Sequence, residues 1–296
     1  MRVATRSLYR TMQDTIIQLS SELKKVNEKV SSGKTIRRPS DDPSAFIDIQ
    51  GLRNNLSRVD QYARNLETGR TWLQMSESAM QQVLGVVDRV KEITIQMAND
   101  DQNAETRAKA AIEVGQLLDQ AVSLGNTMVG DSYLFAGYKT RTTPFVKSDV
   151  GGVETVQYLG DAGDFQIAIG KNELMTAGRD GQSVFMDSNL FQTLGNLKRA
   201  LEVDDANAVR EQLDLLDEAA SHFNNQIADV GISGSRLDGK QEVLSNLSLT
   251  LQERLSNVED ADYASAIIEL KEKEMAYQAA LLSASRLGQL SLMNYL

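Results

Sequence analysis

The sequence predicts a mainly α protein in which long helices from both chain ends form an antiparallel bundle or coiled coil, with a small β domain inserted in the middle. Aromatic residues make up only 5% of the 296 residues, and there are only 3 prolines, which is typical of long helices packed through aliphatic side chains. Apolar residues recur at heptad spacing in both halves of the chain, as expected for helices that pack against helices. Residues 130–195 differ, because they hold 10 of the 20 glycines and 8 of the 16 aromatic residues, which favours short strands and turns.

The first predicted helix, within residues 1–40, carries an apolar seam. Its members follow one another at spacings of three and four residues: Leu8, Met12, Ile16, Leu19, Leu23, Val26 and Val30. Gly33 predicts the end of this helix, because glycine readily adopts the left-handed conformation that terminates helices. After a short loop, Asp42 predicts an N-cap and Pro43 the first residue of the next helix. Together Gly33, Asp42 and Pro43 mark a predicted hinge.

The rest of the chain divides by its patterning. The predicted parts are a first helical core arm at 41–130, an inserted β-rich domain at 131–189, a second helical core arm at 190–261 and a C-terminal assembly helix at 262–296. Within the β-rich domain, alternating residues predict strands at 155–159 and 165–169. Within the second arm, Gly231 and Gly234 predict a turn between two helices.

The C-terminal helix is predicted to pair with residues 1–40. Its apolar side is formed by Ile267, Leu270, Tyr277, Leu281 and Leu287. Because the β insertion lies between the two helical arms, the chain runs out, turns and returns, so the two ends meet as antiparallel partners. A two-helix hairpin buries too little apolar surface to offset the ordering of its residues. We therefore expect both seams to form a self-assembly interface that orders against neighbouring subunits.

Composition excludes several functions. The chain has no cysteine and one histidine, His222, which removes thiolate chemistry and His-rich metal sites and predicts no catalytic residue, metal or cofactor. The net charge is −10, so nucleic acid is not an expected partner. No apolar run is long enough to insert into a membrane. Residues 1–40 nevertheless hold nine basic and three acidic residues, which favours contact with the acidic remainder of an identical subunit.

Both chain ends resemble the bacterial flagellin family. The N-terminal signature is matched by Ser31-Ser32-Gly33-Lys34 and by Pro39-Ser40-Asp41-Asp42-Pro43-Ser44-Ala45, and the C-terminal half by Arg236-Leu237-Asp238 through Asp260-Ala261-Asp262-Tyr263-Ala264. The resemblance implies a structural protein of the bacterial flagellum that is exported unfolded and then assembles outside the cell. It also implies its partners: copies of itself, adjacent hook-associated and flagellin subunits, and a cytoplasmic export chaperone that covers the C-terminal region.

Three further matches favour a subunit at the junction between hook and filament. They are Arg38-Pro39, the run Ser132-Tyr133-Leu134-Phe135-Ala136-Gly137, and the ending Gln289-Leu290-Ser291-Leu292-Met293-Asn294-Tyr295-Leu296. The alternatives are filament flagellin itself, an adhesin or binding module carried by the central β domain, and an enzyme lodged in that domain. The sequence offers an enzyme no nucleophile–base pair and no metal cluster.

Overall fold

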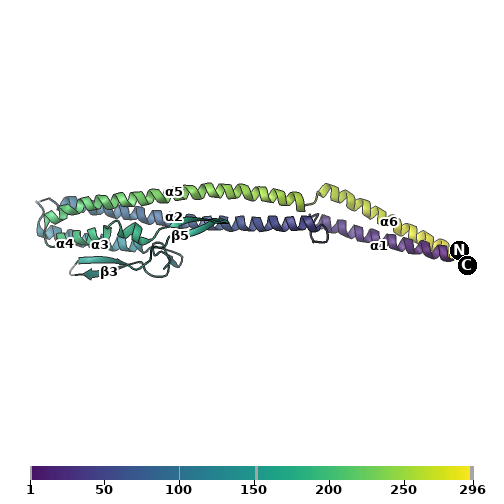
Figure 1. The fold of residues 1–296 in the computed structure, drawn as a ribbon, viewed down its shortest axis with the longest axis horizontal. Helices are drawn as coiled ribbons and strands as arrows, with labels where there is room; N and C mark the ends of the chain where they lie inside the picture. The colour runs from purple at the N-terminus through teal and green to yellow at the C-terminus, as the bar shows by residue number, and fades with distance from the viewer. Residues whose placement is uncertain (1, 100, 151–152, 294–296) are drawn as a thin grey trace. The chain divides into compact units, whose positions relative to one another are not determined.

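The computed structural model describes residues 2–99, 101–150 and 153–293. Its helices are α1 (Arg2–Ser32), α2 (Pro43–Met97), α3 (Ala104–Gly125), the short π-helix η1 (Gln182–Met186), α4 (Leu190–Glu202), α5 (Ala206–Glu259) and α6 (Tyr263–Met293). Its strands are β1 (Met128–Val129), β2 (Ser132–Tyr133), β3 (Phe145–Val150), β4 (Val153–Tyr158), β5 (Phe165–Gly170) and β6 (Glu173–Gly178). The predicted fold class is confirmed, since long helices flank a short central stretch of strands (Figure 1).

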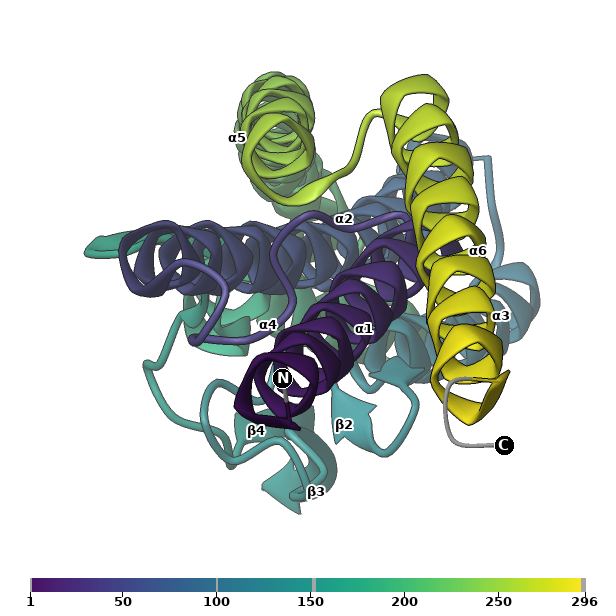
Figure 2. The same ribbon diagram turned by 90° about the vertical axis from the view of Figure 1, so that its right-hand side faces the viewer.

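The chain forms two compact units. Unit 1 comprises residues 1–58 and 247–296, and unit 2 comprises Val59–Asn246. In unit 1, α1 and α6 lie side by side, and their free ends lie on the same side of the unit in both views (Figure 1 and Figure 2). Unit 1 therefore gathers the two ends of the chain, and unit 2 holds all six strands.

Helix α5 runs without a break from Ala206 to Glu259, so the turn predicted at Gly231 and Gly234 is wrong. Glycine lowers helix propensity by about 1 kcal/mol relative to alanine, and that local preference suggested the turn. The flanking residues Val230 and Leu237 are buried. Burial of the apolar side on both sides of the glycines outweighs their local cost and keeps the helix continuous.

The strands form three separate antiparallel hairpins, β1–β2, β3–β4 and β5–β6. The β3–β4 hairpin packs against α3 and α4. The β5–β6 hairpin packs against α2, where Asn65 Nδ2 donates to the Ala168 carbonyl oxygen at 2.7 Å and the ring of Trp72 stacks on Phe165 at 4.4 Å. The β3–β4 and β5–β6 hairpins thus each gain an apolar partner from a helix, which an isolated two-stranded hairpin needs for stability.

The core of unit 2 is centred on the aromatic ring of Phe185, which η1 contributes. Its centroid lies 5.0 Å from that of Phe135, 5.1 Å from that of Phe145 and 5.4 Å from that of Phe223. The one histidine, His222, lies beside this cluster, with its Nε2 2.9 Å from the Ser183 carbonyl oxygen. The aromatic residues that set the central region apart in the sequence therefore join the strands to the helices.

Candidate assembly site at the chain ends

Helices α1 and α6 form an antiparallel pair in unit 1. Lys273 Nζ donates to Glu22 Oε2 at 2.7 Å, and Lys29 Nζ lies 3.6 Å from Glu269 Oε2. The Lys273 ammonium lowers the pKa of the Glu22 carboxyl, and the carboxylate in turn raises the pKa of Lys273. These contacts hold the two terminal helices together as an antiparallel pair, as the predicted fold class requires.

The seam predicted on α1 faces α6 along most of its described length. Five of its residues are half-buried, and Val26 is buried: the five are Met12, Ile16, Leu19, Leu23 and Val30. The side chain of Leu8 lies outside the described part of the structure. The seam residues thus lie in one row towards α6, as their spacing suggested.

Helix α6 is apolar on two sides. Leu270 and Tyr277 are half-buried on the side that carries Glu269 and Lys273, which pair with α1. Ile267 and Leu281, assigned to the same side by the sequence, are instead exposed. The side chain of Leu287 and residues 294–296 lie outside the described part.

A second apolar row on α6 was missed by the sequence interpretation. It consists of Ile268, Met275 and Leu282, which are 62%, 62% and 64% exposed. We call these three residues the α6 stripe. Their seven-residue spacing is itself a heptad pattern. Leu270 and Tyr277 on the same helix are also seven residues apart, so the sequence shows two such rows. The spacing by itself does not show which of the two rows is buried.

Burial within the helix pair is sparse. Among the side chains that the structure describes in α1 and α6, only Val26 and Ala266 are buried. The other apolar side chains that the structure describes in the pair keep part of their surface in solvent.

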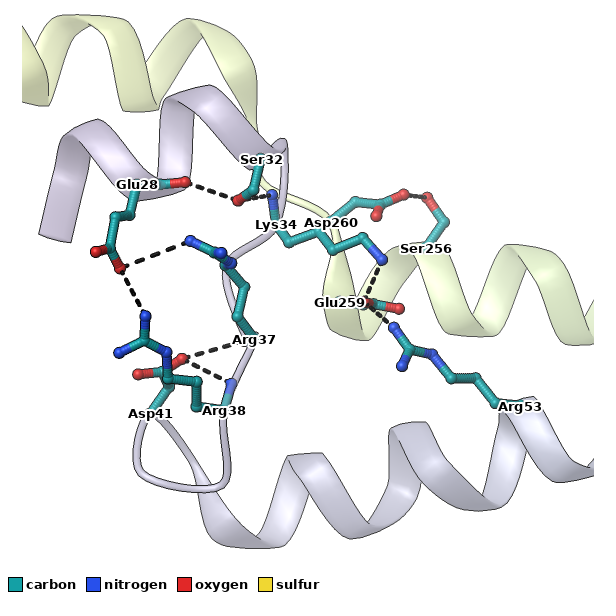
Figure 3. Close-up of polar contacts among 10 residues, drawn as sticks. All are labelled: Glu28, Ser32, Lys34, Arg37, Arg38, Asp41, Arg53, Ser256, Glu259 and Asp260. Atoms are coloured by element: carbon teal, nitrogen blue, oxygen red, sulfur yellow. Dashed lines mark hydrogen bonds and ion pairs between the residues drawn. The ribbon is translucent and has the colours of Figure 1, made fainter.

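A short β-bridge between Lys34 and Asp260 joins the end of α1 to the start of α6, and Figure 3 labels both residues. Gly33 ends α1 with a φ of +69°, a conformation that side chains with a Cβ rarely adopt. Its carbonyl oxygen accepts from the Ala261 N–H at 2.8 Å, and the Thr35 N–H donates to the Glu259 carbonyl oxygen at 2.7 Å. The ring of Tyr263 lies against Gly33, so that a Cβ there would approach the Tyr263 hydroxyl to 3.0 Å.

The carboxylate of Glu259 supports this bridge by pairing with Lys34, one of its two residues. Its side chain is only 4% exposed, and its Oε1 pairs with Lys34 Nζ at 2.6 Å and with the guanidinium of Arg53. We call Glu259, Lys34 and Arg53 the linker clamp. It joins the end of α5, the loop after α1 and the first part of α2 (Figure 3). Sequence interpretation missed Glu259, because no local spacing relates it to partners in the other half of the chain.

Asp41 pins the loop between α1 and α2. Its Oδ2 accepts from the Arg37 N–H at 3.1 Å and the Arg38 N–H at 3.0 Å, and these hydrogen bonds lower the pKa of its carboxyl. The guanidinium groups of both arginines lie 3.6 Å from Glu28 Oε2 (Figure 3). The loop is therefore held both by its own main chain and by α1.

Asp42 accepts hydrogen bonds at the start of α2, whereas Asp41 holds the loop before it. Its Oδ1 accepts from the Ser44 N–H at 2.9 Å and the Ala45 N–H at 3.0 Å, and Pro43 is the first residue of α2. This is the geometry of an N-cap, which satisfies main-chain donors that the first helical turn leaves unpaired. Both aspartates are thus engaged with main-chain amides.

In residues 2–99, 101–150 and 153–293, no group of three or more His, Cys, Asp or Glu side chains is placed to hold a metal ion. The helices of the same ranges include none that is long and apolar enough to cross a bilayer. What the described chain ends offer is apolar surface and a clamped linker.

Comparison with known proteins matches both chain ends. Residues 3–140 match the bacterial flagellin N-terminal helical region, and residues 213–296 match the bacterial flagellin C-terminal helical region. The two matches together cover well over half of the chain. They include α1 and α6 and every member of the linker clamp.

Individual relatives align over nearly the whole chain. The chain is 27% identical over 320 residues to flagellar hook-associated protein 3 of Escherichia coli (strain K12), covering 99% of this chain and 98% of the relative. It is 27% identical over 255 residues to a flagellar filament 30.7 kDa core protein of Treponema maltophilum, covering 86% and 84%. The structure of a putative flagellar hook-associated protein from Vibrio parahaemolyticus superposes with a TM-score of 0.67 at 20% identity, covering 74% of this chain and 100% of that one.

Proposed function

Because this chain belongs to the bacterial flagellin family, we propose that it is a structural subunit that joins the hook of a bacterial flagellum to its filament. The near end-to-end similarity to a hook-associated protein supports the junction role. The proposed role requires no active site and no cofactor. It acts outside the cell, after export, by packing against its neighbours.

The proposal rests mainly on the contrast between the two sides of α6. One side pairs with α1 but buries little, and the α6 stripe lies exposed on the opposite side of the helix. A regular apolar row on a helix is typical of a surface that another helix covers. We infer that copies of this chain, and adjacent hook-associated and flagellin subunits, cover the α6 stripe together with the part of the half-buried α1 seam, from Met12 to Val30, that α6 leaves exposed.

Charge supports contact between like subunits. Residues 1–40 hold nine basic and three acidic residues, although the whole chain carries a net charge of −10. A basic end on an acidic protein is attracted to the acidic part of the next copy. The same acidity argues against nucleic acid as a partner.

The test removes the α6 stripe without touching the α1–α6 contact. A triple variant Ile268→Ser, Met275→Ser, Leu282→Ser should fold as the wild type does but fail to add to isolated flagellar hooks. Ile112→Ser, which changes an equally exposed residue on α3 of unit 2, is the control and should be incorporated normally. A triple variant that is incorporated as well as the control would refute the assembly role of the stripe.

Filament flagellin is the second candidate, favoured by the similarity to a filament core protein. A filament subunit polymerises alone into long filaments, whereas a junction subunit stays monomeric until hook or filament ends are supplied. Electron microscopy of the purified protein, with and without such ends, separates the two. Long filaments of this protein alone would replace the junction proposal by the filament one.

We also propose that a cytoplasmic export chaperone covers the C-terminal region before export. An exposed apolar row on a helix invites aggregation, and helix-in-groove binding is a common way to cover one. The triple stripe variant should therefore lose chaperone binding, measured by co-purification from cells. Glu272→Gln, which changes an exposed polar residue of α6, should retain it.

A further inference from the structure

Methionine provides the most readily oxidised side chains of this protein. The sequence holds ten methionines and no cysteine, so no thiol competes with their sulfur atoms for a peroxide. Oxidation converts the flexible, apolar methionine side chain into the polar sulfoxide. Because the oxidant must reach the sulfur atom, the exposure of each methionine decides which one reacts first.

The methionines differ widely in exposure. Met75 and Met128 are 40% and 44% exposed, and Met275 is 62% exposed. The other methionine side chains that the structure describes are buried or half-buried: Met12, Met80, Met97, Met175 and Met186. Within the described part of the chain, Met275 is therefore the methionine that a peroxide reaches most easily.

Met275 also lies where a polar group would disturb assembly most. It is the middle member of the α6 stripe, with Ile268 seven residues before it and Leu282 seven residues after it. The centre of a contact surface loses its water most completely when a partner covers it. A polar atom at Met275 would therefore lose its water on assembly, whereas Met75 belongs to α2 and lies outside the stripe.

We propose that Met275 is an oxidation site through which peroxides block the addition of this subunit to the flagellum, an inference that rests on the assembly role proposed for the α6 stripe. The sulfur lone pair of Met275 attacks one oxygen of hydrogen peroxide, so that an S–O bond forms and the O–O bond breaks. The proton on the transferred oxygen passes to the departing hydroxide, which leaves as water. The sulfur is oxidised by two electrons, the peroxide is reduced by two, and the product is methionine sulfoxide.

The sulfoxide affects assembly rather than folding. In the free subunit its oxygen accepts hydrogen bonds from water, so the oxidised side chain is tolerated on the surface of α6. Covering the stripe removes that water, and a polar group buried without a partner is costly. The buried Met80, Met97 and Met175 belong to unit 2, where peroxide does not reach them, so unit 2 keeps its stability. A stripe that is already covered shields Met275, which confines the reaction to subunits that have not yet assembled.

The experiment treats the full chain with dilute hydrogen peroxide, removes the peroxide with catalase, and then offers the protein to isolated flagellar hooks. Peptide mass spectrometry should show Met275 oxidised ahead of Met75 and Met128, with Met80 unreacted. Incorporation of the treated protein should fall about tenfold, while its melting temperature stays that of the untreated protein. Treatment with the two methionine sulfoxide reductases, one for each sulfoxide epimer, should restore incorporation.

Two variants identify the responsible sulfur atom, each compared with its own untreated sample. Met275→Leu has no sulfur in the α6 stripe, so peroxide treatment should leave its incorporation unchanged. Met75→Leu removes an exposed methionine of α2, and peroxide treatment should still lower its incorporation about tenfold.

The outcomes separate this oxidation site from the assembly role of the stripe. The site would be overturned by normal incorporation of wild-type protein whose Met275 is fully oxidised, by peroxide sensitivity of Met275→Leu, or by a Met275 that reacts no faster than Met80. The triple stripe variant, assayed on the same hooks without peroxide, tests the assembly role by itself. Its exclusion leaves that role standing whatever peroxide does, and its incorporation refutes the role.

Discussion

The buried carboxylate of Glu259 receives the ammonium of Lys34 at 2.6 Å, although the two residues belong to opposite halves of the chain. Arg53 binds the same oxygen. One side chain at the end of α5 thus holds both segments that lead into the terminal helices. The linker clamp therefore holds the end of α5, the loop after α1 and the first part of α2 together within unit 1.

The first prediction concerns this clamp. Glu259→Gln removes the negative charge that binds Lys34 and Arg53, and hydrogen bonds to charged groups contribute about 1.5–3 kcal/mol. The amides of Thr35 and Ala261 form the adjacent β-bridge, so their hydrogen exchange should accelerate. Glu253→Gln, an exposed position on the same helix, is the control. Unchanged exchange at Thr35 in Glu259→Gln would contradict the clamp.

The second prediction separates the cap from a general effect of charge. Asp42→Ala removes the acceptor of two amides at the start of α2 and should cost about 0.5–2 kcal/mol of unfolding free energy. Asp48→Ala removes the same charge from an exposed position one turn into α2 and should have little effect. Denaturant unfolding measures the free energy of unfolding of both variants, and equal losses would refute the capping role of Asp42.

The third prediction is a pH window for the α1–α6 pair. The hydrogen bond from Lys273 lowers the pKa of Glu22 from 4.5, so its stabilisation is present above that pH and is lost as pH falls through the lowered value. The pKa of Lys273 is raised from 10.5, so its share is present below that pH and is lost as pH rises through the raised value. Hydrogen exchange of α1 should therefore show full protection between these limits.

The control for the pH window is Glu22→Gln. This variant cannot ionise at position 22, so its acid-side loss of α1 protection should be smaller than that of the wild type. Glu253→Gln changes an exposed carboxyl of α5 that acts on neither Glu22 nor Lys273 and should keep the wild-type profile. An identical acid profile in Glu22→Gln would show that other groups set the limit.

The fourth prediction uses two glycines of α3 with opposite surroundings. A Cβ at Gly125 would lie 2.7 Å from the buried ring of Phe145, whereas a Cβ at Gly115 would make ordinary contact with Lys198 at 3.5 Å. Gly125→Ala should therefore destabilise unit 2 by about 1–3 kcal/mol through overpacking. Gly115→Ala should stabilise it by about 0.5–1 kcal/mol, because alanine favours the helix. Thermal unfolding measures both, and shifts of the same sign would contradict the packing at Phe145.

Features with local causes could be predicted from the sequence alone. The strands expected at 155–159 and 165–169 are found at Val153–Tyr158 and Phe165–Gly170. Alternation and glycine turns act over a few residues, so the sequence displays them directly. The fold class follows in the same way from heptad spacing, low aromatic content and a glycine-rich middle.

Features that depend on distant partners required the tertiary structure. Helix α5 passes through Gly231 and Gly234 because Val230 and Leu237 are buried on either side. The α6 stripe and the row that includes Leu270 have the same kind of spacing, and only the position of α1 decides which row is covered. Glu259 meets Lys34 only after segments far apart in the chain have packed. The sequence by itself thus determined the elements and their apolar sides, whereas long-range packing decided which polar groups pair and which apolar surface stays exposed.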